Sequence, residues 1–282
     1  MPAKGIGISP YITRKKKGGG SSIPTSTNAT VQAWLNKIGV DGYTYPSQSK
    51  VDIYTTAWDY ADAQGLTNQF ALVGLPQVPN IDLVKVPFIH RGGASARFTF
   101  VNEADLLFDP LQGITNSDFG SFDGYVETSF NASTQAVAAT LDNTSLGAYV
   151  KGRITLDKGN VNIFGANVSG NACYVGSSSL NIFCRINNSG LNSNFADSTT
   201  DSLFQSAVRT NATQNNNYIN GVLKNTLSAN SVSRPNLTMK VLTITASTGQ
   251  NNCYTSFVSF FYYGSGAIDQ AKMNTFVNLL LL

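Results

Sequence analysis

Alternation of apolar and polar residues with a period of two, from about residue 67 onward, most constrains the fold of this chain. Successive side chains of a β-strand point to opposite faces of a sheet, so this period is typical of half-buried strands. The segments that show it are 98–101, 147–150, 160–164, 180–186 and 237–245. Clusters of Gly, Asn and Asp separate them. Many short strands with such turns predict a β-sandwich or barrel.

Two segments give sharper local predictions. In Tyr218-Ile-Asn-Gly-Val-Leu223, the Asn-Gly pair stands between two strand-like runs. This pair readily adopts the two positive φ angles of a type I′ turn, so we expect a tight β-hairpin here. Residues 257–263 are almost entirely aromatic or apolar. A continuous apolar run of this length predicts a strand that is buried on both faces.

Three other segments have helical character. Thr30 is the expected N-cap of a helix over residues 31–38, where apolar residues recur at i, i+3, i+4 and i+7. Ser49 is the expected cap of a second helix that runs to about Ala63. A third helix is expected from about Ile268. The first two are too short to be stable alone, so we expect them to pack against the β-sheets.

Charge is sparse and unevenly distributed. Only 12% of the residues are charged, so Asn, Ser, Thr, Gln and Gly supply most of the polar surface. Six basic residues precede the first acidic residue, Asp41, whereas the remainder of the chain holds 13 basic and 16 acidic residues. We therefore expect an extended basic, Gly-rich arm over residues 1–27, a helical segment over 28–66, and a sandwich with a C-terminal helix over 67–282.

Several segments, taken in order, resemble one protein family. They are 34–39 with 42–46, 123–131, 145–150, 218–223, and 260–269. The set is similar to structural proteins of tailed bacteriophages, including those of phages of Bacteroidetes, that carry a concanavalin-like (laminin-G-like) β-sandwich. The start Gly5-Ile-Gly-Ile-Ser-Pro10, followed by a basic Gly-rich stretch, also resembles that group. The resemblance implies a mainly β fold, a concanavalin-like sandwich with an N-terminal helical segment and a C-terminal helix.

The resemblance also implies a non-enzymatic structural protein of the virion, assembled in the host cytoplasm, in the capsid, neck or tail. We expect the arm to hold the sandwich to other virion proteins and to copies of itself by strand addition and charge complementarity. The arm residues expected to make these contacts are Ile6, Ile8, Arg14, Lys15, Lys16 and Lys17. Nucleic-acid contact by the arm is less favoured, because the body has no basic stripe. The alternative is a lectin-like module of a tail or head fibre that binds host-surface glycan.

The sequence predicts no catalytic residues. His90 is the only histidine, so a Ser-His-acid triad would have to use it, yet no Gly-x-Ser-x-Gly segment is present. Its position in an apolar segment predicts a structural hydrogen bond at a strand end. Some concanavalin-like folds hydrolyse glycosides with paired carboxylates. Glu103 and Asp105 begin such a pattern, but residues 107 and 108 are apolar, so we expect surface or turn roles for both carboxylates.

Metal, cofactor and disulfide chemistry is not expected. Asp118 and Asp123 lie in a Gly-rich stretch, without the alternating aspartates of a calcium loop, so a turn is the favoured interpretation. The three cysteines, at positions 173, 184 and 253, match neither a disulfide framework nor a zinc site. Cys173 and Cys184 could meet across a hairpin, but we expect reduced, partly buried thiols. The N-terminus has no apolar stretch, so no secretory signal is expected.

Aromatic residues in predicted loops give the remaining candidates. Tyr43, Tyr45 and Tyr218 could stack on sugar rings or anchor the core or an interface, and we favour the second role. No other glycan-binding residue can be assigned. Residues 279–282 form the longest apolar run, which is far too short to cross a bilayer, so no membrane contact is expected.

Overall fold

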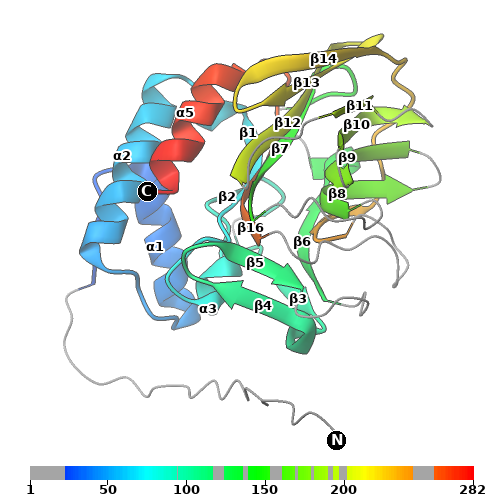
Figure 1. Cartoon of the computed structure of the whole chain (residues 1–282). Helices are drawn as coiled ribbons and strands as arrows, with labels where there is room; N and C mark the ends of the chain where they lie inside the picture. Colours follow the sequence, from blue (N-terminus) through cyan, green and yellow to red (C-terminus); the bar gives the residue numbers. More distant parts are fainter. Residues whose placement is uncertain are drawn as a thin grey trace, which may run out of the picture.

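The computed structural model describes residues 23–93, 95–116, 124–135, 139–152, 161–168, 171–178, 181–189, 193–196, 202–243 and 257–282. The six candidate arm residues, from Ile6 to Lys17, lie outside these ranges, as do Asp118, Asp123 and Cys253. The described chain forms two antiparallel β-sheets, with helices gathered on one side of the larger sheet (Figure 1). The predicted mainly β sandwich is therefore confirmed, and its assignment as concanavalin-like stays a prediction.

Among the described residues, the larger sheet contains nine strands and the smaller one seven. In the larger sheet the order is β14 (Val222–Ser228), β13 (Gln214–Ile219), β12 (Ser202–Asn211), β7 (Thr144–Lys151), β16 (Phe257–Gly264), β1 (Phe70–Gly74) and β2 (Ile89–His90). Two further strands lie off this path: β5 (Gly113–Asn116) pairs with β16, and β4 (Leu106–Asp109) pairs with β5. In the smaller sheet the order is β11 (Ser193–Ala196), β10 (Asn181–Ser189), β9 (Asn171–Ser178), β8 (Val161–Val168), β15 (Thr238–Val241), β6 (Tyr125–Asn131) and β3 (Thr99–Val101). The strand expected over 237–245 is shorter than predicted, because Leu242 takes a positive φ of 72° that breaks the extended backbone.

Two hydrophobic cores lie on opposite faces of the larger sheet. The inner core fills the space between the sheets, and the outer core lies between the larger sheet and the helices. β16 serves both, because Phe261 and Tyr263 belong to the inner core whereas Phe260 and Tyr262 belong to the outer one. All four side chains are fully buried. The prediction of a strand buried on both faces is confirmed.

The outer core is covered by α1 (Ala29–Asp41), α2 (Gln48–Ala63) and α5 (Gln270–Leu280), with the short helix α3 (Ile81–Val84) nearby (Figure 1). Aromatic rings dominate this core. The Trp58 ring lies 5.1 Å from that of Phe276 in α5 and 5.9 Å from that of Phe70 in β1, both as edge-to-face contacts. Such pairs fix the helices on the sheet by shape as well as by burial of apolar area.

The helix starts differ from the sequence prediction. Asn28, not Thr30, is the N-cap of α1, and its Oδ1 accepts hydrogen bonds from the backbone N–H of Thr30 and Val31. The Nδ2 of Asn28 also donates to carboxylates of α2, at Asp59 and Asp62, over 2.8 Å each. Asn28 and Thr30 are both residue types that can cap a helix, and the contacts of Asn28 with α2 favour Asn28. Likewise Ser47, not Ser49, caps α2, and the N-cap of α5 is Asp269, next to the predicted start.

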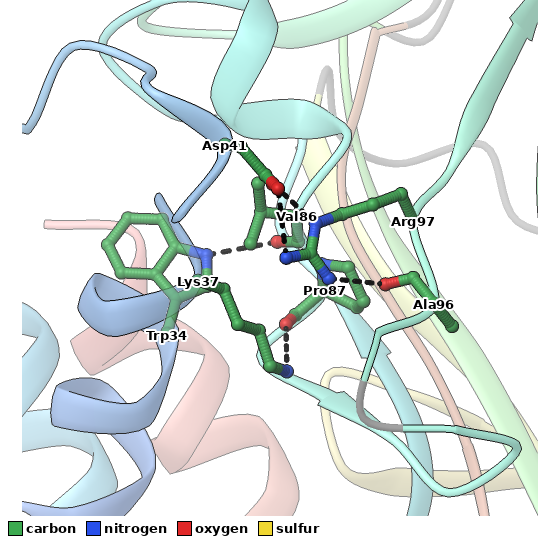
Figure 2. Close-up of polar contacts among 7 residues, drawn as sticks. All are labelled: Trp34, Lys37, Asp41, Val86, Pro87, Ala96 and Arg97. Carbon is green, nitrogen blue, oxygen red and sulfur yellow. Dashed lines mark hydrogen bonds and ion pairs between the residues drawn. The ribbon is translucent and has the colours of Figure 1, made fainter. Parts of the chain in front are cut away.

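Figure 2 shows how α1 is attached to the two segments that flank β2 in the chain. Trp34 Nε1 donates to the carbonyl oxygen of Val86 over 2.9 Å, and Lys37 Nζ donates to that of Pro87 over 3.1 Å. The carboxylate of Asp41, at the end of the helix, pairs with the guanidinium of Arg97. Burial, followed by the nearby charge of Arg97, lowers the pKa of Lys37. Side chains along the last two turns of α1 therefore bind the helix to the body of the protein.

Candidate functional site

The larger sheet extends beyond its helical cover at the β13–β14 hairpin (Figure 1). Alternate residues of β13 are buried, so Asn216 and Tyr218 point to the face opposite the inner core. The strand register places Leu223 opposite Tyr218 and Thr226 opposite Asn216. These four side chains share one face, which we call the hairpin face. Leu223 is 50% exposed, Thr226 is exposed, and the other two are half-buried.

The turn of this hairpin is rigidly placed. Asn220 and Gly221 have φ angles of 49° and 78°, and Ile219 pairs with Val222, as predicted for a type I′ hairpin. The side chain of Asn220 accepts a hydrogen bond from the backbone N–H of Phe204 over 2.9 Å. A Cβ on Gly221 would lie 2.9 Å from a backbone oxygen in the first turn of α5. The hairpin is therefore fixed both to β12 and to α5.

The hairpin face combines one aromatic ring with small polar groups. Thr226 Oγ1 and Asn216 Oδ1 are hydrogen-bonded over 2.8 Å, and the Tyr218 hydroxyl is hydrogen-bonded to the Asn216 side chain. Partial burial raises the pKa of Tyr218, and the negative charge of Asp269 adds to the rise. The phenol is therefore neutral at physiological pH. An uncharged face with a ring and polar groups can stack against C–H groups and hydrogen-bond to hydroxyls.

The other two candidate tyrosines have a different environment. Tyr43 and Tyr45 are half-buried and pack against the outer core. The backbone of Gly39, near the end of α1, is so close to the Tyr45 hydroxyl that a Cβ on this residue would overlap with it. Tyr43 and Tyr45 therefore have the core-anchoring role that the sequence favoured, whereas Tyr218 lies on the hairpin face.

His90 is held by hydrogen bonds at both ring nitrogens. The Nε2 lies 2.9 Å from the carbonyl oxygen of Thr128, and the backbone N–H of Gly92 donates to Nδ1 over 3.2 Å. This pattern assigns the proton to Nε2, because a carbonyl can only accept and Nδ1 is already an acceptor. Burial is the main cause of the lowered pKa of His90. The ring has no free nitrogen for a general base or a metal ligand, as its predicted structural role requires.

The candidate carboxylates lie in a short turn. Glu103 and Asp105 form the 3₁₀ helix η2 (Glu103–Asp105), and neither is buried. The Glu103 carboxylate is 47% exposed and 3.9 Å from the ammonium of Lys85. These are the surface and turn positions that the sequence predicted. Within the described residues, no cluster of three or more His, Cys, Asp or Glu side chains could hold a metal ion.

Cys173 and Cys184 are free thiols that are fully buried, whereas partial burial was predicted. They belong to adjacent strands, but Cys173 lies opposite Ile186 and Cys184 opposite Val175, so they do not form a directly opposed pair. Burial raises the pKa of Cys173 to about 12 and also strongly raises the pKa of Cys184. Both thiols therefore stay protonated at physiological pH and have little nucleophilic character.

The sequence did not single out Asn216, Leu223 and Thr226 as site residues. The Asn-Gly turn fixes the pairing of Tyr218 with Leu223, and this much was readable from the sequence. A register shift between Asn217 and Tyr218 then moves the rest of β14 by one residue, which places Thr226 opposite Asn216. A bulge of this kind leaves no clear signal in a single sequence.

Comparisons with known proteins identify the fold and not a family. No family model matches the chain, and no curated protein matches it. Among solved structures, the binding domain of botulinum neurotoxin serotype D matches with a TM-score of 0.53 and 14% identity, over 76% of this chain and 52% of that one. The receptor binding domain of botulinum neurotoxin C/D mosaic serotype matches with a TM-score of 0.55 and 13% identity, over 75% and 51%.

A third structure, described as a receptor binding domain, matches with a TM-score of 0.53 and 15% identity, over 78% of this chain and 53% of that one. This chain thus spans about half the length of each. At such identity the likeness shows a shared β-sandwich fold, and the similarity to phage proteins stays a prediction. In the part of the chain that the structure describes, no helix is both long and apolar enough to span a bilayer.

Proposed function

We propose that this chain is a non-enzymatic binding module that recognises a glycan on a host-cell surface through the hairpin face. The observation that carries the proposal is the position of Tyr218, half-buried at the end of the helical layer, beside Asn216 and Thr226. The fold likeness to domains named as binding and receptor binding domains supports a recognition role. Their own receptors are not transferred, because this chain spans about half of their length.

The physical case for a saccharide is the pairing of ring and hydrogen-bonding groups on a rigid surface. The Tyr218 ring and the exposed Leu223 side chain offer apolar area for the C–H face of a pyranose. The hydroxyl of Thr226 and the amide of Asn216 offer partners for sugar hydroxyls. The absence of charge on these four residues favours a neutral sugar. A face held by strands loses little entropy when it binds.

A binding assay with the full chain tests the proposal. Arrays of host-surface oligosaccharides and intact host cells would identify a ligand, and titration calorimetry would then measure its affinity. We expect Tyr218→Ala to weaken binding at least about tenfold, which corresponds to the loss of one aromatic contact of about 1.4 kcal/mol. Tyr218→Phe should retain most of the affinity, because the ring is kept.

The matched control is Lys224→Ala, on the neighbouring strand β14. Lys224 is exposed and lies at the register shift, where it pairs with no residue of β13. It should bind like the unmodified chain. Equal binding by Tyr218→Ala and Lys224→Ala would contradict the assignment of the site, and no binding to any host glycan or host cell would contradict the function.

A second proposed function is a structural role in the particle of a tailed phage, with residues 1–27 as the anchor. The charge asymmetry of the sequence favours it, since five of the six basic residues that precede Asp41 lie in residues 1–27. Deletion of residues 2–20 should leave the sandwich folded and abolish incorporation into particles. Normal incorporation of the shortened chain would contradict the anchor. The two functions are compatible, because a fibre protein needs both an attachment and a receptor-binding surface.

A further inference from the structure

The inner face of β12 and β13 is polar, in contrast to the apolar core between the rest of the two sheets. On β12, Leu203 and Ala207 belong to the inner core, so Gln205 and Arg209, at alternate positions, point the same way. On β13, Asn215 alternates with the inner-core residue Ile219 and also points inward. Gln205, Arg209 and Asn215 have 0% exposure. We call these three residues the inner polar cluster.

The strand register brings the cluster together around a small residue. Val208 pairs with Asn216 and Asn211 pairs with Gln214, so Arg209 and Thr210 together lie opposite Asn215 in a β-bulge. Arg209 and Asn215 are therefore cross-strand neighbours. Ala207 separates Arg209 from Gln205 along the same face of β12. Asn217 of β13, which is also fully buried, pairs with Ala207 between them.

Arg209 joins the two sheets through backbone carbonyls. Its Nε donates to Ile186 of β10 over 3.1 Å, and its Nη1 donates to Ala229 over 2.9 Å and to Ala212 over 3.1 Å. Within the described residues, no carboxylate forms an ion pair with it. The third nitrogen, Nη2, is buried and has no hydrogen-bonding partner in the described part of the chain.

The two amides of the cluster have no partner among the residues that the structure describes. The side-chain nitrogen and oxygen of both Gln205 and Asn215 are buried, and no described residue forms a hydrogen bond with them. With Nη2 of Arg209, five polar atoms would then be desolvated without compensation. A penalty repeated over so many atoms would offset much of the stability of a folded domain. A molecule from solvent must therefore satisfy them.

We propose that the inner polar cluster is a binding site for ordered water between the two sheets. The chemistry of the atoms selects water over ions. An anion would suit Nη2 and the amide nitrogens, but it would be repelled by the amide oxygens. A cation would suit those oxygens, but it would be repelled by the guanidinium. Water both donates and accepts, and buried waters typically make two to four such bonds.

Nuclear magnetic resonance of the full chain, labelled with ¹⁵N, tests the proposal directly. We expect dipolar cross-peaks between water and the side-chain NH₂ groups of Gln205 and Asn215, with the sign that indicates water bound for longer than a nanosecond. The NH₂ group of Asn216, which is half-buried on the opposite face of β13, serves as a reference outside the space between the sheets. Absence of long-lived water at both inner amides would overturn the proposal.

Substitution gives a second, independent readout. If the cluster were dry, Gln205→Leu and Asn215→Leu would each remove two unpartnered atoms, and the midpoint of urea unfolding would rise. If water is bound, each change removes partners of that water and leaves Nη2 of Arg209 less well satisfied, so the midpoint should fall. Asn216→Leu is the control for a change of amide to leucine on the same strand. A rise in the midpoint for both inner variants would contradict bound water.

Discussion

The larger sheet has two regions that differ in what covers their outer face. Over β1 and β16, the helices bury a layer of aromatic rings that includes Trp58 and Phe260. At the β13–β14 hairpin, the same face carries Asn216 and Tyr218, which are half-buried, and Thr226, which is exposed. The strands are continuous hydrogen-bonded neighbours, so the sheet itself does not distinguish the regions. The difference shows that the helical layer decides which part of the sheet is core and which part can bind.

The largest expected effect is a loss of stability when a buried ring in the region covered by the helices is removed. Trp58 is fully buried and contacts the rings of Phe70, Phe88 and Phe276. Trp58→Ala should therefore reduce the free energy of unfolding by about 3–5 kcal/mol. Chemical denaturation measures the change. A loss below about 1 kcal/mol would mean that the helical layer is not firmly packed on the sheet.

The next effect concerns the attachment of the helices to one another. Asn28→Ala removes the N-cap of α1 and two hydrogen bonds to carboxylates of α2. We expect a loss of about 2 kcal/mol, since a cap alone contributes about 1 kcal/mol and bonds to charged groups add to it. Thr30→Ala is the matched control and should change stability by less than about 0.5 kcal/mol. Equal losses of stability for the two variants would contradict the assignment of Asn28, rather than Thr30, as the N-cap of α1.

A smaller effect is a dependence of stability on pH, which we expect from His90 in β2. The pKa of His90 is lower in the folded state than its ordinary value, mainly because of burial. The unfolded chain therefore binds a proton at His90 more tightly than the folded chain does. The contribution of His90 to the free energy of unfolding is fully present above about pH 6.5 and is lost as the pH falls below that value. Urea unfolding at pH 7.5 and pH 5 should show this loss, and His90→Gln should reduce the difference. An unchanged difference in the variant would exclude His90 as its source.

The smallest effect on stability is expected in the open region. Tyr218 is half-buried, and its neighbours on the hairpin face are small or exposed. Tyr218→Ala should thus cost no more than about 1 kcal/mol, well below the cost of Trp58→Ala. The same denaturation assay makes the comparison. A loss comparable to that of Trp58→Ala would place Tyr218 in a core and remove the contrast between the regions.

Local features were predictable where the residues dictate the backbone. The Asn-Gly turn requires positive φ angles, and the aromatic run of β16 has no polar alternation, so the hairpin and the doubly buried strand followed from the sequence. The helix caps were not predictable. Asn28 and Thr30 are both competent caps, and the choice depends on Asp59 and Asp62, about thirty residues away.

The candidate site was predictable only in part. Tyr43, Tyr45 and Tyr218 are equivalent in sequence, because each is an aromatic residue near turn-forming neighbours. Tyr43 and Tyr45 pack against the outer core and Tyr218 does not, and this difference depends on the extent of the helical layer. The inner polar cluster also had no signal, since amides at alternate positions of a strand normally point to solvent.

The most direct test of the proposed binding surface is to measure both the glycan affinity and the free energy of unfolding of two variants of the full chain. For Tyr218→Ala we predict a loss of binding of at least about tenfold together with a loss of stability of no more than about 1 kcal/mol. Lys224→Ala should change neither quantity. If Tyr218→Ala binds the same glycan as tightly as Lys224→Ala, the open end of the sheet is not the binding surface.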